Sequence, residues 1–126
     1  MYENQKFSFE GLEVYRYARE LVKGIYILQN NFPKEEKYAL GDQIRRSATS
    51  ITSNIAEGSG RSSIREKIHF IEIAFGSMTE SFSHLQNAQD LGYILEEDID
   101  KLRPLYNRVA ALLSNLRKSF ERRIQD

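Results

Sequence analysis

Residues 38–61 read YALGDQIRRSATSITSNIAEGSGR, and the apolar positions of this segment recur at the spacing of one helix face. That face is formed by Leu40, Ile44, Ala48, Ile51 and Ile55. Small polar residues flank it where a globular helix usually carries leucine or alanine, namely Ser47, Ser50, Ser53 and Asn54. Because such small side chains let another helix approach closely, the segment predicts a helix in tight contact with a neighbour.

Three further segments show the same helical periodicity, and strand-like alternation does not persist anywhere in the chain. The expected helices span residues 10–31, 34–57, 64–91 and 95–123. Connections of only a few residues force helices that are neighbours in sequence to lie antiparallel. The sequence therefore predicts an all-α protein, an up-down-up-down four-helix bundle forming a single domain over residues 1–126.

Proline, glycine and capping residues mark the expected helix boundaries. Phe32-Pro33 ends the first helix, because proline disfavours a helical conformation in the residue before it. Residues 63–66, Ser-Ile-Arg-Glu, have the form of a capping box, and Gly92 is typical of a left-handed stop. Gly41 marks a local break or a point of close approach in the second helix. Pro104 falls inside the fourth helix, where we expect a bend or a fresh helix start.

Composition narrows the functional classes. A chain of 126 residues buries a core without a metal or disulfide staple, and it contains no cysteine. The first eight residues hold no apolar run, so neither a signal peptide nor a membrane span is expected, and we expect a cytoplasmic protein without membrane contact. Eighteen basic and eighteen acidic residues cancel, so any attraction to nucleic acid depends on how the charges are distributed.

Few residues suggest catalysis or a metal site. Glu66 and His69 have the spacing of a di-iron helix, but the second copy of that motif is missing, and His84 lies about 22 Å further along the same helix. Glu80 and His84 suit a helix-surface pair better than a metal. The segment 58–61 resembles part of a phosphate loop without its lysine and is better interpreted as an inter-helix turn. We expect no enzyme, no metal and no cofactor.

Basic residues gather in three places: Arg45 and Arg46, then Arg61, Arg65 and Lys67, then Arg117, Lys118, Arg122 and Arg123. The first two groups are candidate phosphate ligands. For Arg45 and Arg46 an ion pair with Asp42, or with an acid of a neighbouring subunit, is an equal alternative. The last group is interpreted as compensation of the helix dipole. We place it at the opposite end of the bundle from the second group, which predicts two separate basic regions.

More apolar surface is present than one seam per helix uses. The surplus either widens the inward faces or forms an interface between copies. Gly76 and Ser77 lie in mid-helix, where glycine costs about 1 kcal/mol relative to alanine, so close helix contact is a reasonable compensation. The expected oligomer interface comprises Ser47, Ser50, Ser53, Phe70, Ile73, Gly76 and Ser77.

A long set of motifs resembles the four-helix-bundle family encoded in intervening sequences of bacterial large-subunit ribosomal RNA genes. The matching positions include Phe9, Leu12, Val14-Tyr15, Ile25-Tyr26, Phe32–Glu36, Tyr38, Leu40, Gln43–Ala48, Ser50-Ile51, Asn54–Gly58, Phe70-Ile71, Ile73-Ala74, Gly76-Ser77, Glu80, Ala88, Leu91 and Tyr93. The resemblance implies a homopentamer without established enzymatic activity. It also connects the chain to the accessory variability determinant proteins of diversity-generating retroelements, which are similar but strongly basic pentamers that bind nucleic acid and a reverse transcriptase.

These observations lead to one hypothesis and one alternative. The hypothesis is a non-enzymatic homo-oligomer that acts as an RNA-binding accessory module, with Arg45 and Arg46 as first contacts and Arg61, Arg65 and Lys67 beside them. The alternative is a protein–protein scaffold that binds no nucleic acid and whose arginines form ion pairs between subunits.

Overall fold

The computed structural model describes residues 3–125, which form four long α-helices and two short 3-10 helices. In chain order these are η1 (Ser8–Gly11), α1 (Glu13–Gln29), η2 (Lys34–Glu36), α2 (Leu40–Ser59), α3 (Ile64–Asp90) and α4 (Glu96–Gln125). No strand occurs in this part of the chain. The expected all-α class is confirmed.

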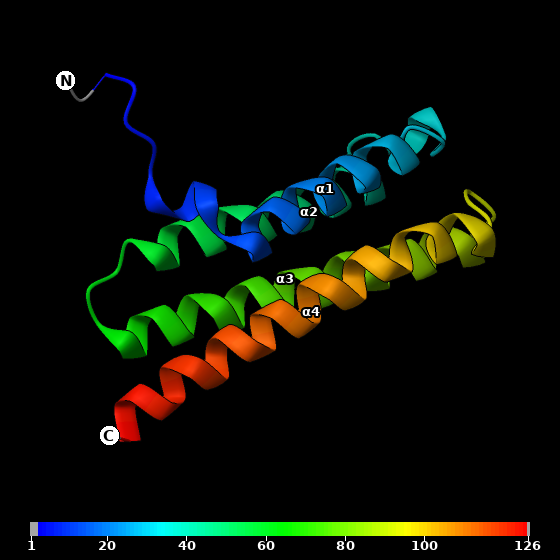
Figure 1. Ribbon diagram of the computed structural model, residues 1–126. Coiled ribbons are helices and arrows are strands. Elements are labelled where there is room, and N and C mark those ends of the chain that lie inside the picture. The colour runs from blue at the N-terminus through cyan, green and yellow to red at the C-terminus, as the bar shows by residue number, and fades with distance from the viewer. Residues whose placement is uncertain (1–2, 126) are drawn as a thin grey trace.

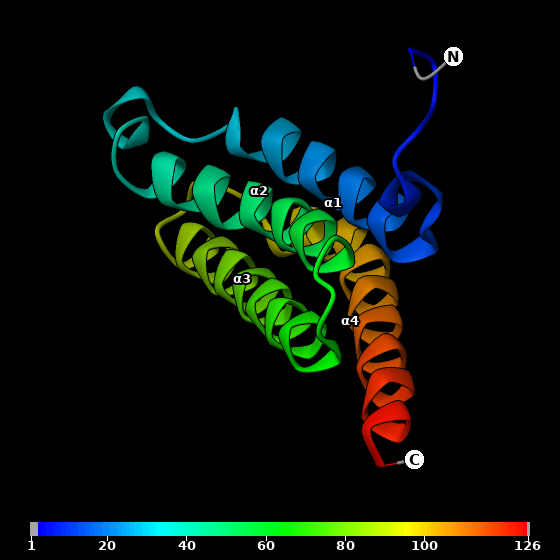
Figure 2. The same ribbon diagram turned by 90° about the vertical axis from the view of Figure 1, so that its left-hand side faces the viewer.

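The long helices pack as a ring in which each contacts two neighbours. Contacts join α1 to α2, α2 to α3, α3 to α4 and α4 back to α1, and the pair formed by α2 and α3 is the most extensive. Successive helices run in opposite directions, as Figure 1 shows, which confirms the up-down-up-down bundle. Figures 1 and 2 both show α4 diverging from α3 toward the C-terminus.

The core explains why α2 and α3 lie so close together. Its layers combine branched side chains such as Leu21, Ile25, Ile44 and Ile51 with alanines that are fully buried. The buried alanines are Ala18, Ala48, Ala74 and Ala88. Full burial of each leucine or isoleucine contributes about 1.5–3 kcal/mol, and the small residues bring the helix axes close enough for that packing.

The segment expected to form one helix over residues 34–57 is divided in two. Residues 34–36 form η2, Ala39 takes a non-helical backbone conformation, and α2 begins only at Leu40. The Glu36 carboxylate accepts a hydrogen bond from the Leu40 amide at 3.0 Å, which satisfies a free donor at the new helix start. Gly41 lies at the close approach, because a Cβ there would be 2.8 Å from the Glu36 carbonyl oxygen.

The expected first helix, residues 10–31, is also shorter in the structure. Leu12 is extended and separates η1 from α1, and α1 ends at Gln29. The third helix matches closely: the Ser63 hydroxyl accepts from the Glu66 amide at 3.4 Å, and the helix ends at Asp90. Gly92 has φ of 81°, which confirms the left-handed stop.

The fourth helix runs without interruption from Glu96 through Pro104 to Gln125. Of the two outcomes expected at this proline, a bend or a fresh helix start, the fresh start does not occur. Ile99 lies before the proline and Tyr106 and Val109 lie after it, and all three are buried in the same core. Packing on both sides offsets the roughly 3 kcal/mol that an interior proline costs a helix.

Candidate nucleic-acid interface

The end of α2, the start of α3 and the end of α4 lie at the same end of the bundle, as Figure 1 shows. An ion pair of 3.2 Å between Arg117 and Glu72 joins α4 to α3 near this end. The expectation of two basic regions at opposite ends is therefore wrong. The second and fourth helices of an up-down-up-down bundle run in the same direction, so their C-termini share one end.

This shared end carries an excess of positive charge. We call it the cationic end and define it as residues 57–72 and 117–125, which include seven basic and four acidic residues. The basic residues are Arg61, Arg65, Lys67, Arg117, Lys118, Arg122 and Arg123. The group that was expected to compensate the helix dipole thus lies beside the group that was expected to bind phosphate.

Three of these cations have partners within the chain. Arg61 forms an ion pair of 2.6 Å with Glu57, and its guanidinium lies 4.8 Å from the centroid of the Phe70 ring. Arg117 binds Glu121 at 2.8 Å in addition to Glu72. The Lys67 ammonium donates to the Ser59 carbonyl oxygen at 3.0 Å, which closes the turn between α2 and α3.

The other four, Arg65, Lys118, Arg122 and Arg123, are exposed and have no carboxylate partner within residues 3–125. Arg123 stacks over Phe120 at 5.4 Å, which leaves its outward edge open. Side chains of this kind are suited to phosphate groups, because a guanidinium offers several donors in one plane.

Arg45 and Arg46 lie far from the cationic end. Thirteen residues separate Arg46 from the last residue of α2, which corresponds to about 20 Å of helix rise. The expectation that these arginines lie beside Arg61, Arg65 and Lys67 is therefore wrong. Only the order of these two groups along the chain had suggested that they form one surface.

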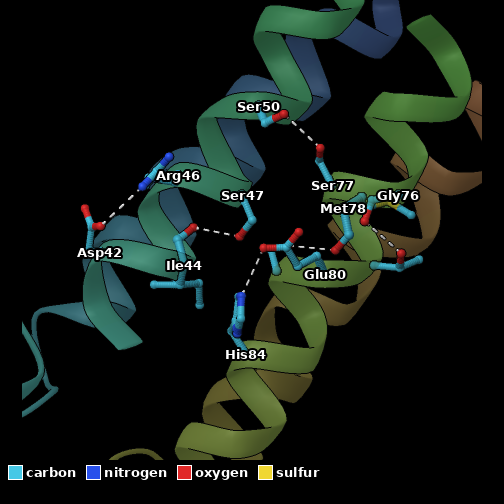
Figure 3. A network of polar contacts seen from close by, with 12 residues as sticks. Asp42, Ile44, Arg46, Ser47, Ser50, Gly76, Ser77, Met78, Glu80 and His84 are labelled. Atoms are coloured by element: carbon cyan, nitrogen blue, oxygen red, sulfur yellow. Dashed lines mark hydrogen bonds and ion pairs between the residues drawn. The ribbon is translucent and has the colours of Figure 1, made fainter. Parts of the chain in front are cut away.

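Arg45 makes structural contacts within the chain. Its two terminal nitrogens donate to the Gln29 side-chain oxygen at 2.6 Å and to the Lys37 carbonyl oxygen at 2.7 Å, and its side chain is 23% exposed. These bonds tie the start of α2 to the end of α1. Arg46 remains 80% exposed, with Asp42 at 3.8 Å (Figure 3).

The small-residue face of α2 forms its contact inside the chain. Ser50 and Ser77 share a hydrogen bond of 2.8 Å across the α2–α3 contact, and Figure 3 shows the two hydroxyls pointing toward one another. Ser47 is 4% exposed and donates to the Ile44 carbonyl oxygen. Ser47 is thus corrected from an expected contact between copies to a core residue, and Ser50 and Ser77 bridge two helices of one chain.

The other expected interface residues divide into two groups. Phe70 and Ile73 are partly buried, and Phe70 packs over Gly58 and under Arg61. Ser53 and Gly76 are exposed. A Cβ added at Gly76 would meet nothing within 4 Å, so no contact within the described chain requires glycine there.

The histidines lie apart. His84 and Glu80 form the expected helix-surface pair at 3.1 Å (Figure 3), and the His84 Nδ1 atom has no partner among the described residues. His69 is exposed, with its ring edge against Phe70. Within residues 3–125, no three His, Cys, Asp or Glu side chains are grouped so that they could hold a metal ion.

A cavity of about 210 Å³ opens at the cationic end, where α4 diverges from the other helices. Its walls come from α2, α3, α4 and the segment before α1, and they include Ile55, Ile71 and Phe120. The sequence did not predict this cavity, because it depends on the angle at which α4 leaves the bundle. None of the described helices is long and apolar enough to span a membrane.

The fold and the charges define a class of protein: small antiparallel four-helix bundles with an excess of positive charge at one end. The family model for 23S rRNA-intervening sequence proteins matches residues 10–115. The chain therefore belongs to the 23S rRNA-intervening sequence protein family, in agreement with the resemblance noted in the sequence.

A solved structure supports the same assignment. The chain is similar to a protein of unknown function from the S23 ribosomal protein family of Bacteroides thetaiotaomicron VPI-5482, with a TM-score of 0.75 and 26% identity. The similarity covers 83% of this chain and 98% of the other. No curated protein matches the chain.

Proposed function

We propose that this protein is a non-enzymatic homo-oligomer that binds RNA through the cationic end. The observation that carries the proposal is the presence of four exposed cations there without a carboxylate partner in the described residues, one on α3 and three on α4. Exposed lysine and arginine side chains attract phosphate, and each phosphate contact adds to affinity by releasing a counterion. The charge and the accessibility of these side chains together support a ligand that carries phosphate groups.

Zero net charge is compatible with this function because the charges are segregated. The opposite end, residues 28–46 and 90–103, carries six basic and eight acidic residues. We call this the closed end. One end thus has an excess of positive charge and the other an excess of negative charge, so an approaching polyanion is steered toward the cationic end.

Gly76 supports the oligomeric part of the proposal. An exposed glycine in mid-helix costs about 1 kcal/mol, and the described chain itself offers no contact that requires it. If the backbone of a second copy packs against α3 at this point, it leaves no room for a side chain, and the position then requires glycine. In a ring such as the homopentamer that the resemblance implies, several cationic ends act on one RNA and their contacts combine.

The pairing of arginines weighs against the scaffold alternative. Six of them each lie within 4.0 Å of a carboxylate of the same chain, namely Arg45, Arg46, Arg61, Arg103, Arg108 and Arg117. These side chains are already satisfied and have little to gain from acids of another subunit. At the cationic end, by contrast, four exposed cations have no such partner in the described chain, which leaves them available to phosphate groups.

The test measures the affinity for a labelled RNA hairpin as a function of salt. Arg65→Glu with Arg122→Glu should lower affinity by about tenfold or more and flatten the logarithmic salt dependence by about 0.7–0.9 for each phosphate interaction that is removed. The matched control is Lys34→Glu with Lys101→Glu, which makes the same change of charge at exposed positions of the closed end. Equal reductions in the two variants, or no binding by the wild-type protein, would contradict the proposal.

The oligomer is tested separately by mass in solution. Gly76→Leu should dissociate the assembly, because the new side chain occupies the space required by the second copy. Gln86→Leu, at another exposed position of α3, should leave the mass unchanged. A wild-type mass of 14.7 kDa at all concentrations would show that the chain is a monomer.

A further inference from the structure

We infer that the groove between α1 and α2 binds single-stranded RNA by stacking bases on tyrosine. This second surface goes beyond phosphate binding at the cationic end, and it rests on the proposed function in that RNA is the ligand. The groove has an open volume of about 470 Å³. Its lining is formed by Tyr15, Arg19, Val22, Lys23, Tyr26, Thr49 and Thr52.

One wall of the groove is a stripe along α1. Tyr15, Arg19, Val22 and Tyr26 follow one another at helical spacings of four, three and four residues, so they share one face. Tyr15 is partly buried and packs edge-on against Phe9 with ring centroids 4.9 Å apart. Tyr26 is 37% exposed. The groove thus offers one aromatic ring held in place and one accessible to a ligand.

The charges of the groove are exclusively positive. Arg19 and Lys23 are the charged residues in its lining, and neither pairs with a carboxylate within residues 3–125. The Arg19 guanidinium lies over the Tyr15 ring, 6.0 Å from its centroid, so Tyr15 holds this cation in the groove while Tyr26 is the ring open to a base. Positive charge beside exposed aromatic rings is the combination that single-stranded nucleic acids require.

The opposite wall supplies hydrogen-bond acceptors. The Thr49 hydroxyl donates to the Arg45 carbonyl oxygen at 3.0 Å, and the Thr52 hydroxyl donates to the Thr49 carbonyl oxygen at 3.1 Å. Because both hydroxyl protons are used within α2, only the oxygen lone pairs face a ligand. The ribose 2′-hydroxyl can donate to such oxygens, and DNA lacks this group.

The same features distinguish a single strand from other occupants. Bases inside a duplex are stacked on each other and do not expose their faces to tyrosine. A two-fold contact between the grooves of two copies would set Arg19 and Lys23 against the same residues of the partner, and like charges in an interface are unfavourable. A single strand brings both the negative charge and the free base faces.

The binding test compares three labelled probes: oligouridylate, an abasic strand with the same phosphates, and an RNA duplex. Tyr26→Ala should weaken oligouridylate binding about tenfold, within the range measured when one stacking side chain is removed, and leave the abasic strand unchanged. Tyr26→Phe should bind like the wild type, because stacking needs the ring and not the hydroxyl. Tyr38→Ala is the matched control, since Tyr38 is 85% exposed and lies outside the groove.

Two further measurements do not depend on removing a tyrosine. Lys23→Gln should reduce the logarithmic salt dependence for oligouridylate by about 0.7, the value for one phosphate contact on a single strand. In the wild-type protein, photocrosslinking with 5-iodouridine RNA should attach the strand to the peptide that contains Tyr26. The solution mass of each variant is measured alongside, so that loss of assembly is seen directly.

The outcomes separate this inference from the proposed function. Two results together would overturn RNA binding in the groove: crosslinks confined to α4, and an equal loss of affinity for oligouridylate and the abasic strand in every variant. RNA binding at the cationic end would still stand. Dissociation of the oligomer by Tyr26→Ala without any change in RNA affinity would show that the groove is a contact between copies. Absence of binding to all three probes would overturn both.

Discussion

The two ends of the bundle are built in different ways. At the closed end, Tyr93 donates to the Glu36 carboxylate at 3.1 Å and thereby links the loop after α3 to η2. Arg45 joins α2 to α1 at the same end. The chain reverses at Gly92, where the amides of Gly92 and Tyr93 donate back to carbonyl oxygens in the last turn of α3. At the cationic end α4 diverges from α3, as Figure 2 shows. A cavity lined by residues of α2, α3 and α4 opens at this end.

Under the proposed function, the closed end stabilises the fold and the cationic end binds RNA. Hydrogen bonds between separate segments hold the closed end in one arrangement. Its excess of acidic residues repels a polyanion. At the cationic end, ion pairs are exposed and individually weak, worth about 0–1 kcal/mol each. An end with unpartnered cations and an open wall can accommodate a ligand at little cost to the fold, so mutations at the two ends should affect different properties.

The largest expected contrast comes from two buried isoleucines of α2. Ile44 is 0% exposed near the closed end, whereas Ile55 is 5% exposed and lines the cavity at the cationic end. Replacing isoleucine by alanine costs about 2–5 kcal/mol, depending on how well the site relaxes. We expect Ile44→Ala near the top of that range and Ile55→Ala near the bottom, as measured by urea unfolding. Equal costs would show that the cavity does not loosen this end.

A smaller contrast is expected between two arginines. Arg45→Ala removes two charge-assisted hydrogen bonds at the closed end and should cost about 1–3 kcal/mol of unfolding free energy. Arg122→Ala, at an exposed cation without a carboxylate partner in the described chain, should change stability by about 0.5 kcal/mol at most. RNA affinity should respond in the opposite order. If Arg45→Ala weakens RNA binding while the solution mass is unchanged, the closed end also takes part in binding, and the separation of stability from binding is wrong.

The features that are local in sequence could be predicted from it. The apolar seams of all four helices, the Ser63 cap and the reversal at Gly92 depend on residues within one or two turns of each other, and each is found in the structure. The break before α2 could not be predicted in the same way. It depends on the Glu36 carboxylate, which accepts from the Leu40 amide and also from the Tyr93 hydroxyl, 57 residues later in the chain.

The candidate site was harder to predict because it joins distant segments. The helix directions alone place the C-termini of α2 and α4 at the same end of the bundle. The cationic end could therefore have been predicted from the sequence. The structural role of Arg45 was not, since its partner Gln29 lies sixteen residues earlier on another helix. In the groove, the stripe from Tyr15 to Tyr26 is visible in the sequence, but the opposite wall at Thr49 and Thr52 is not.

The smallest expected effect lies between the two ends, in the layer formed by Ser81 and Tyr106. The Ser81 hydroxyl donates to the Met78 carbonyl oxygen, so the Tyr106 hydroxyl donates to Ser81 at 2.8 Å. Tyr106→Phe removes this bond and should cost about 1 kcal/mol near neutral pH, measured by urea unfolding. A cost above about 3 kcal/mol would mean that this layer, and not the closed end, holds the bundle together.

The same variant has a pH dependence with a definite sign. Burial of its side chain raises the pKa of the Tyr106 hydroxyl above its ordinary value. The unfolded chain therefore loses this proton near pH 10 while the folded chain keeps it, so the contribution of Tyr106 is complete below pH 10 and falls as the pH rises further. The advantage of the wild type over Tyr106→Phe should shrink by up to about 1.4 kcal/mol per pH unit in that window. Unfolding curves at about pH 8 and above pH 10 measure it, and a constant difference would show that Tyr106 ionises as readily folded as unfolded.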